Sequence, residues 1–175
     1  MILSKYRRLR IPALFFVLVF MLPAFQSCGV YTFSGANIGT AKTISIDFIQ
    51  NKASLVSPSL SQVFTEKLKD KFLRETTLKL VDAGGDMHLS GTIIDYAIAP
   101  IALQGTTQAA QNRLTVKSNI KFTNKTEEKF NFEQVFQNFT DFDASINFSS
   151  RERALNETVI DMMVQDVFNK AVINW

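Results

Sequence analysis

The sequence predicts an α+β fold in which two helices pack on one face of a small mixed or antiparallel β-sheet. Several segments alternate apolar and polar residues, which is typical of strands with one buried face. Two longer segments carry apolar residues at helical spacing, one early in the chain and one at its carboxyl end. Strand runs bracketed by helices favour a sheet with both helices on the same side.

The first predicted elements are a strand and a helix. Residues 42–49 alternate apolar and polar side chains and predict a strand. Ser57 and Pro58 have the residue types preferred at the N-cap and the first helical position, so a helix is predicted from there to about Glu75. Its apolar stripe consists of Leu60, Val63, Phe64, Leu68 and Phe72.

The middle of the chain predicts two further strands. Residues 77–81 predict a short strand, and residues 82–86, with two glycines, predict a turn. Residues 87–99 predict a long strand, in which Gly91 favours a bulge or bend. Residues 100–111 predict a connection.

The last strands and the second helix follow. Residues 113–123 alternate strongly and predict a strand, with a polar turn after it. Residues 130–142 predict an aromatic strand, and Phe139, out of phase with its other phenylalanines, predicts a bulge near its end. Ser149 and Glu152 have capping-box spacing, so a helix is predicted from Ser149 almost to the end of the chain. Its predicted inward residues are Leu155, Val159, Ile160, Met163, Val164, Val167 and Phe168.

Residues 1–27 have the pattern of a secretory signal peptide. Four basic residues lie within the first ten, and a stretch of about fifteen mostly apolar residues follows. A membrane-spanning helix needs ~20 such residues. Cys28 comes directly after a small residue at the end of this stretch, which resembles the lipobox of bacterial lipoproteins. The resemblance implies cleavage before Cys28 and its modification with a diacylglycerol thioether and an N-acyl chain. Residues 28–41, rich in Gly, Ser and Thr, would then be a lipidated tether.

Composition limits the remaining function classes. One cysteine excludes an internal disulfide framework, and one histidine leaves little room for His-based metal or triad chemistry. The chain carries 19 basic and 16 acidic residues, for a net charge of +3. Cleavage after residue 27 removes four basic residues and no acidic ones, which leaves 15 against 16 and a charge of −1. The basic pI therefore describes the signal peptide, and nucleic acid is not a predicted partner.

No catalytic or metal-binding set can be assembled from the sequence. His88 lies in a predicted strand near Asp86 and Asp95, where a histidine is usually structural. Asp141 and Asp143 form a possible carboxylate pair without a histidine or cysteine partner. The glycines before Asp86 lack the strand-to-helix context of a phosphate loop. We therefore predict a protein that is not an enzyme, with no cofactor apart from the lipid on Cys28 and no metal.

One strand offers a candidate anion-binding surface. Arg113, Lys117 and Lys121 are spaced by four, which places them on one face of a strand at ~13 Å intervals. Such a row can meet several phosphates or carboxylates at once, and an anionic glycolipid fits the envelope location that a bacterial lipoprotein implies. The alternative is a solvated strand that uses basic residues against aggregation.

Five segments together resemble the LptE family of lipopolysaccharide-assembly lipoproteins. They are residues 28–35 (CGVYTFSG), 60–68 (LSQVFTEKL), 91–96 (GTIIDY), 112–116 (NRLTV) and 166–175 (DVFNKAVINW). The resemblance implies one LptE-like α+β domain over residues 42–175. It also implies a periplasm-facing outer-membrane lipoprotein that plugs and helps to assemble the LptD β-barrel and contacts lipopolysaccharide.

Two other functions stay open at this point. A stand-alone periplasmic lipid- or ligand-binding lipoprotein predicts an apolar cavity and no barrel partner. An envelope hydrolase requires a polar constellation that the sequence does not display.

Overall fold

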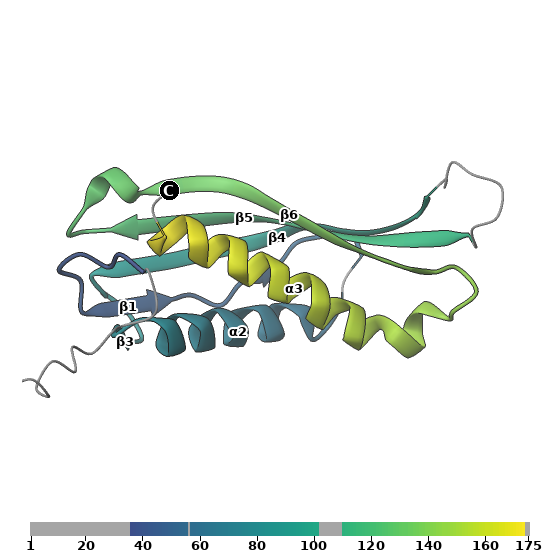
Figure 1. The fold of residues 1–175 in the computed structure, drawn as a ribbon, viewed down its shortest axis with the longest axis horizontal. Helices are drawn as coiled ribbons and strands as arrows, with labels where there is room; N and C mark the ends of the chain where they lie inside the picture. Colours follow the sequence, from purple (N-terminus) through teal and green to yellow (C-terminus); the bar gives the residue numbers. More distant parts are fainter. Residues whose placement is uncertain (1–35, 56, 102–109, 174–175) are drawn as a thin grey trace, which may run out of the picture. The chain divides into compact units, whose positions relative to one another are not determined.

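The computed structural model describes residues 36–55, 57–101 and 110–173, which belong to one compact unit (Figure 1). Two helices and a mixed six-stranded sheet confirm the predicted α+β class. The signal peptide at 1–27, Cys28 and most of the predicted tether lie outside the described residues.

The sheet combines a parallel and an antiparallel half. Its main strand order is β3-β1-β4-β5-β6, and β2 pairs separately with β4. The pairs β1–β3, β1–β4 and β2–β4 are parallel, whereas β4–β5 and β5–β6 are antiparallel. The strands span β1 Thr43–Ile46, β2 Gln50–Asn51, β3 Lys79–Leu80, β4 Met87–Ile101, β5 Gln111–Asn124 and β6 Phe132–Asp143.

The predicted strand over residues 42–49 is wrong in its second half. Only β1 (Thr43–Ile46) forms within this range, and β2 begins after it at Gln50. The alternation fails between the two strands: Phe48 is 58% exposed while Ile49 is fully buried. The Ile49 amide donates to Thr65 Oγ1 at 3.0 Å, so a contact with the following helix turns Ile49 into the core. The predicted strand at 77–81 is likewise shortened, to the two residues of β3.

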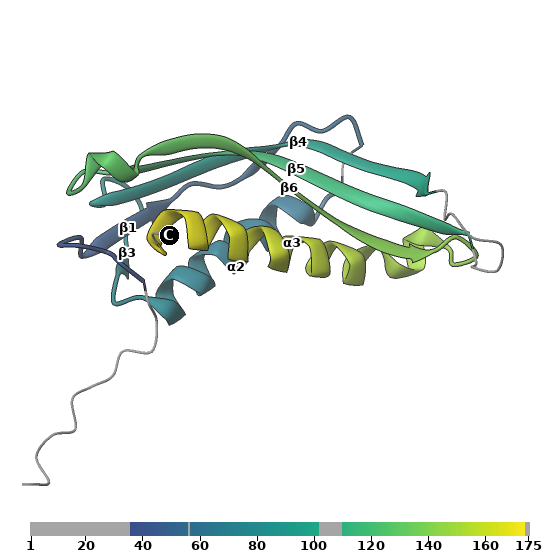
Figure 2. The ribbon, with the colours of Figure 1, turned by 45° about the horizontal axis from the view of Figure 1, so that its top comes forward.

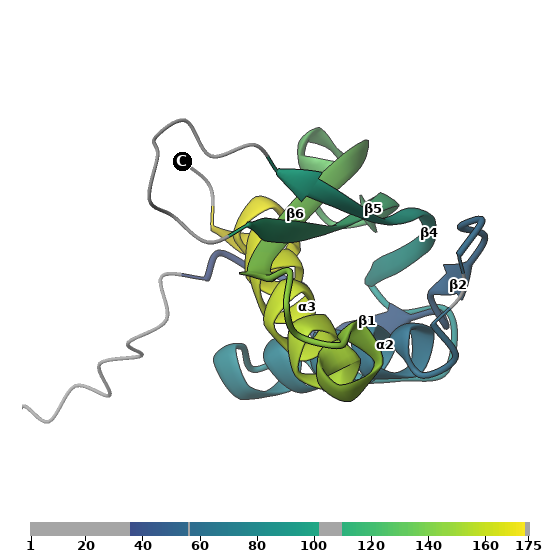
Figure 3. The same cartoon turned by 90° about the vertical axis from the view of Figure 1, so that its right-hand side faces the viewer.

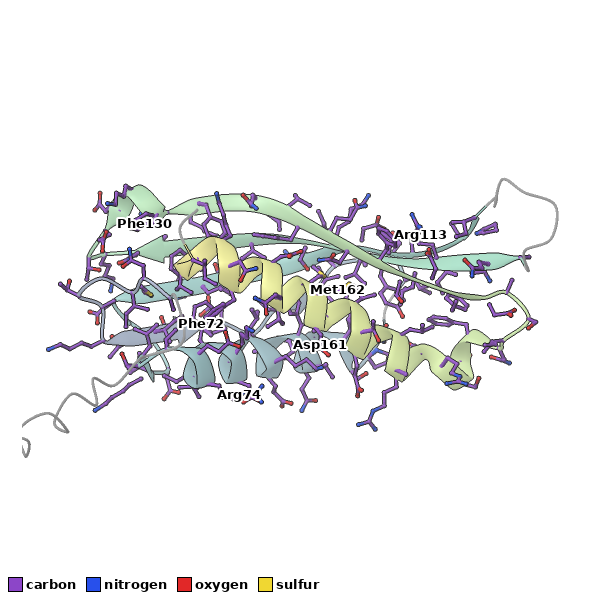
Figure 4. All side chains as sticks on the ribbon, viewed as in Figure 1. Phe72, Arg74, Arg113, Phe130, Asp161 and Met162 are labelled. Carbon is purple, nitrogen blue, oxygen red and sulfur yellow. The ribbon has the colours of Figure 1, made fainter. Side chains whose placement is uncertain are left out.

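Both helices cover the same face of the sheet, as predicted (Figure 2). Helix α2 (Leu60–Glu75) packs against β1, β2 and β3, and α3 (Phe148–Val172) packs against β5 and β6. Phe72 of α2 lies between the two helices (Figure 4), with its ring edge-on to Phe168 of α3 at a centroid distance of 5.1 Å. Among the described residues, neither helix combines the length and apolar composition that crossing a bilayer requires.

The predicted helix starts are wrong by two residues. Ser59, not Ser57, is the N-cap of α2, and Ser57 is buried in a contact with the other helix. Asn147, not Ser149, is the N-cap of α3, and its Oδ1 accepts the Ser149 amide at 2.9 Å. The side chain of Asn147 therefore caps α3, whereas Ser59 begins α2 without a capping hydrogen bond from its side chain.

The register shift in β4 lies between Ile93 and Asp95, not at Gly91. The extra residue, Ile94, reverses the alternation, so that Asp95 faces away from the helices and Tyr96 faces the core. Gly91 keeps a regular register opposite Ile120, where a Cβ would lie 2.5 Å from the Ile120 Cδ1 atom. Glycine is therefore required there for close packing rather than for a bend.

The predicted bulge at Phe139 is also wrong. Strands β5 and β6 pair in one unbroken register from Gln111–Asp143 to Phe122–Phe132. Phe139 simply belongs to the opposite face from Phe136 and Phe142. Phe130 lies outside β6, in a short 3-10 helix, η2 (Glu128–Phe130).

The hydrophobic core lies between the sheet and the two helices. The apolar residues of the alternating strand β5 (Leu114, Val116, Ile120 and Phe122) are fully buried. Most residues of the two predicted helical stripes are also buried, and Val63 and Leu155 lie at the edge of the core. The largest fully buried side chains are Phe64, Phe72, Phe122, Phe168, Ile44, Ile49, Leu60, Leu68, Met87, Leu89, Ile93 and Leu114. Burial of this many large apolar side chains supplies most of the driving force for folding.

Candidate functional site on the outer face of the sheet

We use the term outer face for the side of β4, β5 and β6 that is turned away from the helices (Figure 3). Strand pairing and burial assign the side chains to this face. On β5 they are Arg113, Thr115, Lys117, Asn119 and Lys121, and on β6 they are Glu133, Val135, Gln137, Phe139 and Asp141. The three predicted basic residues therefore lie in one row along β5.

Each basic residue of this row has a carboxylate on a neighbouring strand. Arg113 Nε lies 2.7 Å from Asp141 Oδ1 of β6, and Lys117 Nζ lies 3.2 Å from Asp95 Oδ2 of β4. Lys121 Nζ lies 4.0 Å from Glu133 Oε2 of β6. The row is therefore a set of three solvent-accessible ion pairs rather than an uncompensated positive stripe.

Arg113 is the most constrained member of the row. Its Nε and Nη2 donate to both oxygens of Asp141, at 2.7 and 2.8 Å, and its guanidinium lies 3.7 Å from the centre of the Phe139 ring. The paired hydrogen bonds hold the pKa of Asp141 below its usual range and raise that of Arg113. Figure 4 places Arg113 on the strands, whereas Arg74 and Asp161 lie on the helices. The bidentate pair and the aromatic ring together fix the plane of the guanidinium.

The strength of these ion pairs determines how readily the row can exchange its carboxylates for another anion. An exposed pair between oppositely charged side chains is weak, typically ~0–1 kcal/mol, because water and salt screen it. A phosphate that approaches the row therefore competes with carboxylates that are held only loosely at Lys117 and Lys121. Arg113, with its bidentate geometry, is the member that gives up its carboxylate least readily.

The structure also brings together a serine, a histidine and an aspartate. His88 Nδ1 lies 2.9 Å from Ser45 Oγ, and His88 Nε2 lies 3.3 Å from Asp47 Oδ2. Ser45 is fully buried, and its hydroxyl also lies 3.4 Å from the Met87 carbonyl oxygen. The serine therefore has a structural position between β1 and β4 and does not present a nucleophile to a substrate.

The acids that the sequence placed near His88 serve other contacts. Asp86 Oδ2 accepts hydrogen bonds from the Lys42 amide (2.9 Å), the Thr43 amide (3.0 Å) and the Thr43 hydroxyl (2.9 Å). The pKa of Asp86 is lowered, chiefly by the Lys42 amide. Asp95 pairs with Lys117 instead. Sequence proximity did not identify Ser45 and Asp47, because only the parallel pairing of β1 with β4 brings them to His88.

Asp141 and Asp143 do not act as a pair. Asp141 is bound to Arg113, while Asp143 Oδ1 accepts from the amide and the hydroxyl of Ser145, which lowers the Asp143 pKa. Gly84, with φ of 74°, lies in the connection between β3 and β4, and its carbonyl oxygen accepts from Lys125 Nζ at 3.1 Å. Across residues 36–55, 57–101 and 110–173, His, Cys, Asp and Glu side chains form no group of three that could hold a metal ion.

A buried polar chain that sequence reasoning missed ties both helices to the sheet. Tyr96 Oη of β4 donates to Asn156 Oδ1 of α3 at 2.8 Å, and Asn156 Nδ2 donates to Ser57 Oγ, just before α2, at 2.9 Å. Burial, and then the nearby charge of Glu152, raise the pKa of Tyr96 to about 12. The signal that could have indicated this contact is Tyr96 itself, because a tyrosine in a buried position usually has a hydrogen-bond partner for its hydroxyl.

Comparison with solved structures found a protein above a TM-score of 0.5, which shows the same general fold at low sequence identity, and others below it. A hypothetical protein from Chlamydia trachomatis aligns with a TM-score of 0.52 and 6% identity, over 77% of this chain and 99% of the other. A minor lipoprotein from Acinetobacter baumannii aligns with a TM-score of 0.49 and 13% identity, over 74% and 91% of the two chains. Rare lipoprotein B from Shewanella oneidensis aligns with a TM-score of 0.39 and 15% identity, over 74% and 90%. A search of curated protein sequences found no match.

The fold and its outer face define a two-layer α+β domain with a polar, ion-paired sheet surface. The family model described as "LptE: Lipopolysaccharide-assembly" matches residues 41–171, which is almost the whole of the described domain. The chain belongs to this LptE lipopolysaccharide-assembly family.

Proposed function

We propose that this protein is a non-catalytic, lipid-anchored subunit of the outer-membrane machinery that delivers lipopolysaccharide, facing the periplasm and paired with an LptD-type β-barrel. In this role it plugs the barrel, assists its assembly and contacts lipopolysaccharide in transit. The observation that carries the proposal is the family match over residues 41–171. This range contains all six strands, helix α2, and helix α3 as far as Ala171.

Membrane attachment is assigned to Cys28, the only cysteine in the chain. Each buried methylene contributes ~0.8 kcal/mol to membrane binding, and one acyl chain alone holds a protein only marginally. Two or three chains on one residue give stable anchoring. Mass spectrometry of the mature amino terminus tests this assignment: an acylated Cys28 supports it, and a free Cys28 thiol contradicts it.

Lipopolysaccharide contact is assigned to Arg113, Lys117 and Lys121. They lie in one row on the outer face, at a spacing suited to an extended ligand with several anionic groups. The paired acids Asp95, Glu133 and Asp141 reduce the net charge of this surface. This favours reversible contact, which a transport component requires, over tight retention of the lipid.

Co-purification tests the proposal directly. The mature protein, carrying an affinity tag at its carboxyl end, is extracted from outer membranes in mild detergent and purified. We expect a large β-barrel protein to be recovered in about equal amount. Recovery of the tagged protein without any barrel would contradict the proposal and favour the stand-alone periplasmic binding protein.

A further inference from the structure

We infer that a polar hollow at one end of the outer face binds a neutral sugar ring, which adds a carbohydrate subsite to the proposed lipopolysaccharide contact and rests on that proposed function. The hollow has a volume of about 640 Å³, within the range of small-ligand sites. Its floor is formed by outer-face residues of β4 and β5, and its walls include the β1–β2 connection and β6.

The lining offers hydrogen-bond donors and acceptors side by side. Thr92 supplies a hydroxyl, Gln50 and Asn119 supply amides, and Asp82 and Glu133 supply carboxylates. Hydroxyl and amide groups both donate and accept, whereas carboxylates accept only. Sugar hydroxyls are themselves donors and acceptors on neighbouring carbons, so this mixture matches a polyhydroxylated ligand better than a purely anionic or purely cationic one.

Phe48 adds an apolar wall to this polar hollow. Its side chain is 58% exposed, the highest value among the large exposed hydrophobic residues of the described chain, although the sequence alternation had predicted it in the core. An aromatic ring offers a flat apolar surface on which the C–H face of a sugar ring can pack. The buried Ile49 amide, held by Thr65, fixes the backbone conformation that turns Phe48 outward.

The charges around the hollow disfavour other ligands. Three acids (Asp47, Asp82 and Glu133) and one base (Lys121) line it, so an isolated anion is repelled. Asp47 Oδ2 lies 3.3 Å from His88 Nε2, and Glu133 accepts from Asn119 Nδ2 at 3.1 Å, so two of the three carboxylates already have polar partners and are less available to a cation. An acyl chain would leave the polar groups of the floor without water. A neutral hydroxylated ring avoids all three costs.

The hollow also continues the basic row. Lys121, the last member of the row, lines the hollow as well. A ligand that carries both phosphate groups and sugars can therefore place its phosphates along Arg113 and Lys117 and a neutral ring beside Phe48. Lipopolysaccharide has this combination, whereas a cell-wall glycan supplies the ring without the phosphates.

Calorimetric titration of the mature full-length protein in detergent tests the inference. The first probe is a core oligosaccharide released from lipopolysaccharide and dephosphorylated, and the second is a peptidoglycan disaccharide. We expect the core oligosaccharide to bind with an affinity that hardly changes with salt, because no charge is neutralised. Phe48→Ala should weaken binding about tenfold, and Thr92→Val, which keeps the shape but removes a hydroxyl, about threefold.

Leu73→Ala is the control, because Leu73 is a large hydrophobic residue on α2, 44% exposed like Phe139 but outside both the hollow and the basic row. It should leave the affinity for the neutral oligosaccharide unchanged. Binding of the peptidoglycan disaccharide alone would mean that the hollow is a sugar site whose ligand is a cell-wall glycan and not lipopolysaccharide. Binding of neither probe, or equal binding by the wild type and Phe48→Ala, would overturn the inference. Co-purification of the β-barrel with the Phe48→Ala variant is measured as well. If the variant still recovers the barrel, loss of sugar binding concerns the hollow and not the proposed function.

Discussion

Arg113 on β5 and Asp141 on β6 form a bidentate ion pair, with hydrogen bonds of 2.7 and 2.8 Å, and the ring of Phe139 lies against the same guanidinium. This pair is the best-defined contact in the basic row. Because its geometry depends on the continuous β5–β6 register, the row is positioned by the sheet and not by a flexible loop. The positive charge of the row is nevertheless balanced by three acids. Mutation of either the basic residues or these acids should therefore change the affinity of the row for an anionic ligand.

Reversing the charge of the row should weaken lipopolysaccharide binding. We expect the triple variant Arg113→Glu, Lys117→Glu and Lys121→Glu to lose affinity for lipid A phosphate about tenfold or more at low salt, and the difference to shrink as salt screens the charges. Binding to lipid A vesicles is measured from low to high ionic strength.

The matched control reverses three exposed basic residues of the two helices, Arg74, Arg151 and Lys170, and changes the net charge equally. It should retain most of the wild-type affinity. Equal losses in both triple variants would show that net charge, rather than the row, governs binding.

Neutralising the acids should have the opposite effect. The variant Asp95→Asn, Glu133→Gln and Asp141→Asn removes the carboxylates that compete with a bound phosphate. We expect lipid A to bind more tightly, about three- to tenfold, and to dissociate more slowly. Surface plasmon resonance with immobilised protein measures both quantities. An unchanged affinity would mean that the ion pairs and the phosphate site are separate.

Tyr96 should control stability at alkaline pH. Its pKa is raised to about 12 in the folded protein from an ordinary value of about 10, so folding favours the neutral phenol. This contribution is complete below about pH 10 and is lost as the pH rises through about 12. Tyr96→Phe should cost roughly 1–3 kcal/mol at neutral pH, because Asn156 loses a buried donor. Urea unfolding at pH 7 to 11 should show the gap between wild type and variant narrowing with pH; a constant gap would contradict this assignment.

Asp86 should control stability at acid pH. Its folded pKa is lowered, so the carboxylate stabilises the fold above the ordinary value of about 4, and this contribution is lost as the pH falls through the lowered folded value. Asp86→Asn should melt below the wild type at pH 7, because it weakens the contacts to Lys42 and Thr43 at the start of β1. The two melting curves should converge toward pH 2. Asp70→Asn, on the exposed side of α2, is the control; if it matched Asp86→Asn, the assigned contacts would not be the cause.

Much of the fold is predictable from local patterns. The alternation of β5 and the helical stripes of α2 and α3 identify the core, because both periods are set by backbone geometry. The reversal of alternation between Ile93 and Tyr96 is visible in the sequence and marks the true bulge. Gly91 was a misleading signal, since glycine also occurs where a neighbouring side chain leaves no room for a Cβ.

Contacts between distant segments were not predictable. Ile49 rather than Phe48 enters the core because Thr65, sixteen residues later, accepts its amide. The row on β5 follows from spacing alone, but its partners Asp95 and Asp141 depend on the register of two other strands. The meeting of Ser45, Asp47 and His88 likewise requires the parallel pairing of β1 and β4. Local sequence therefore predicts which residues face outward on β5, whereas tertiary contacts decide what those residues meet and override the local pattern at Phe48 and Ile49.

Site-specific photo-crosslinking in living cells tests most directly the claim that the outer face contacts lipopolysaccharide. A photoreactive residue replaces Thr115, between Arg113 and Lys117 on the outer face, or Gln165, which is exposed on α3. We predict a lipopolysaccharide adduct at position 115 and little or none at position 165. Adducts of equal yield at both positions, or an adduct only at position 165, would contradict the assignment of lipopolysaccharide to this face.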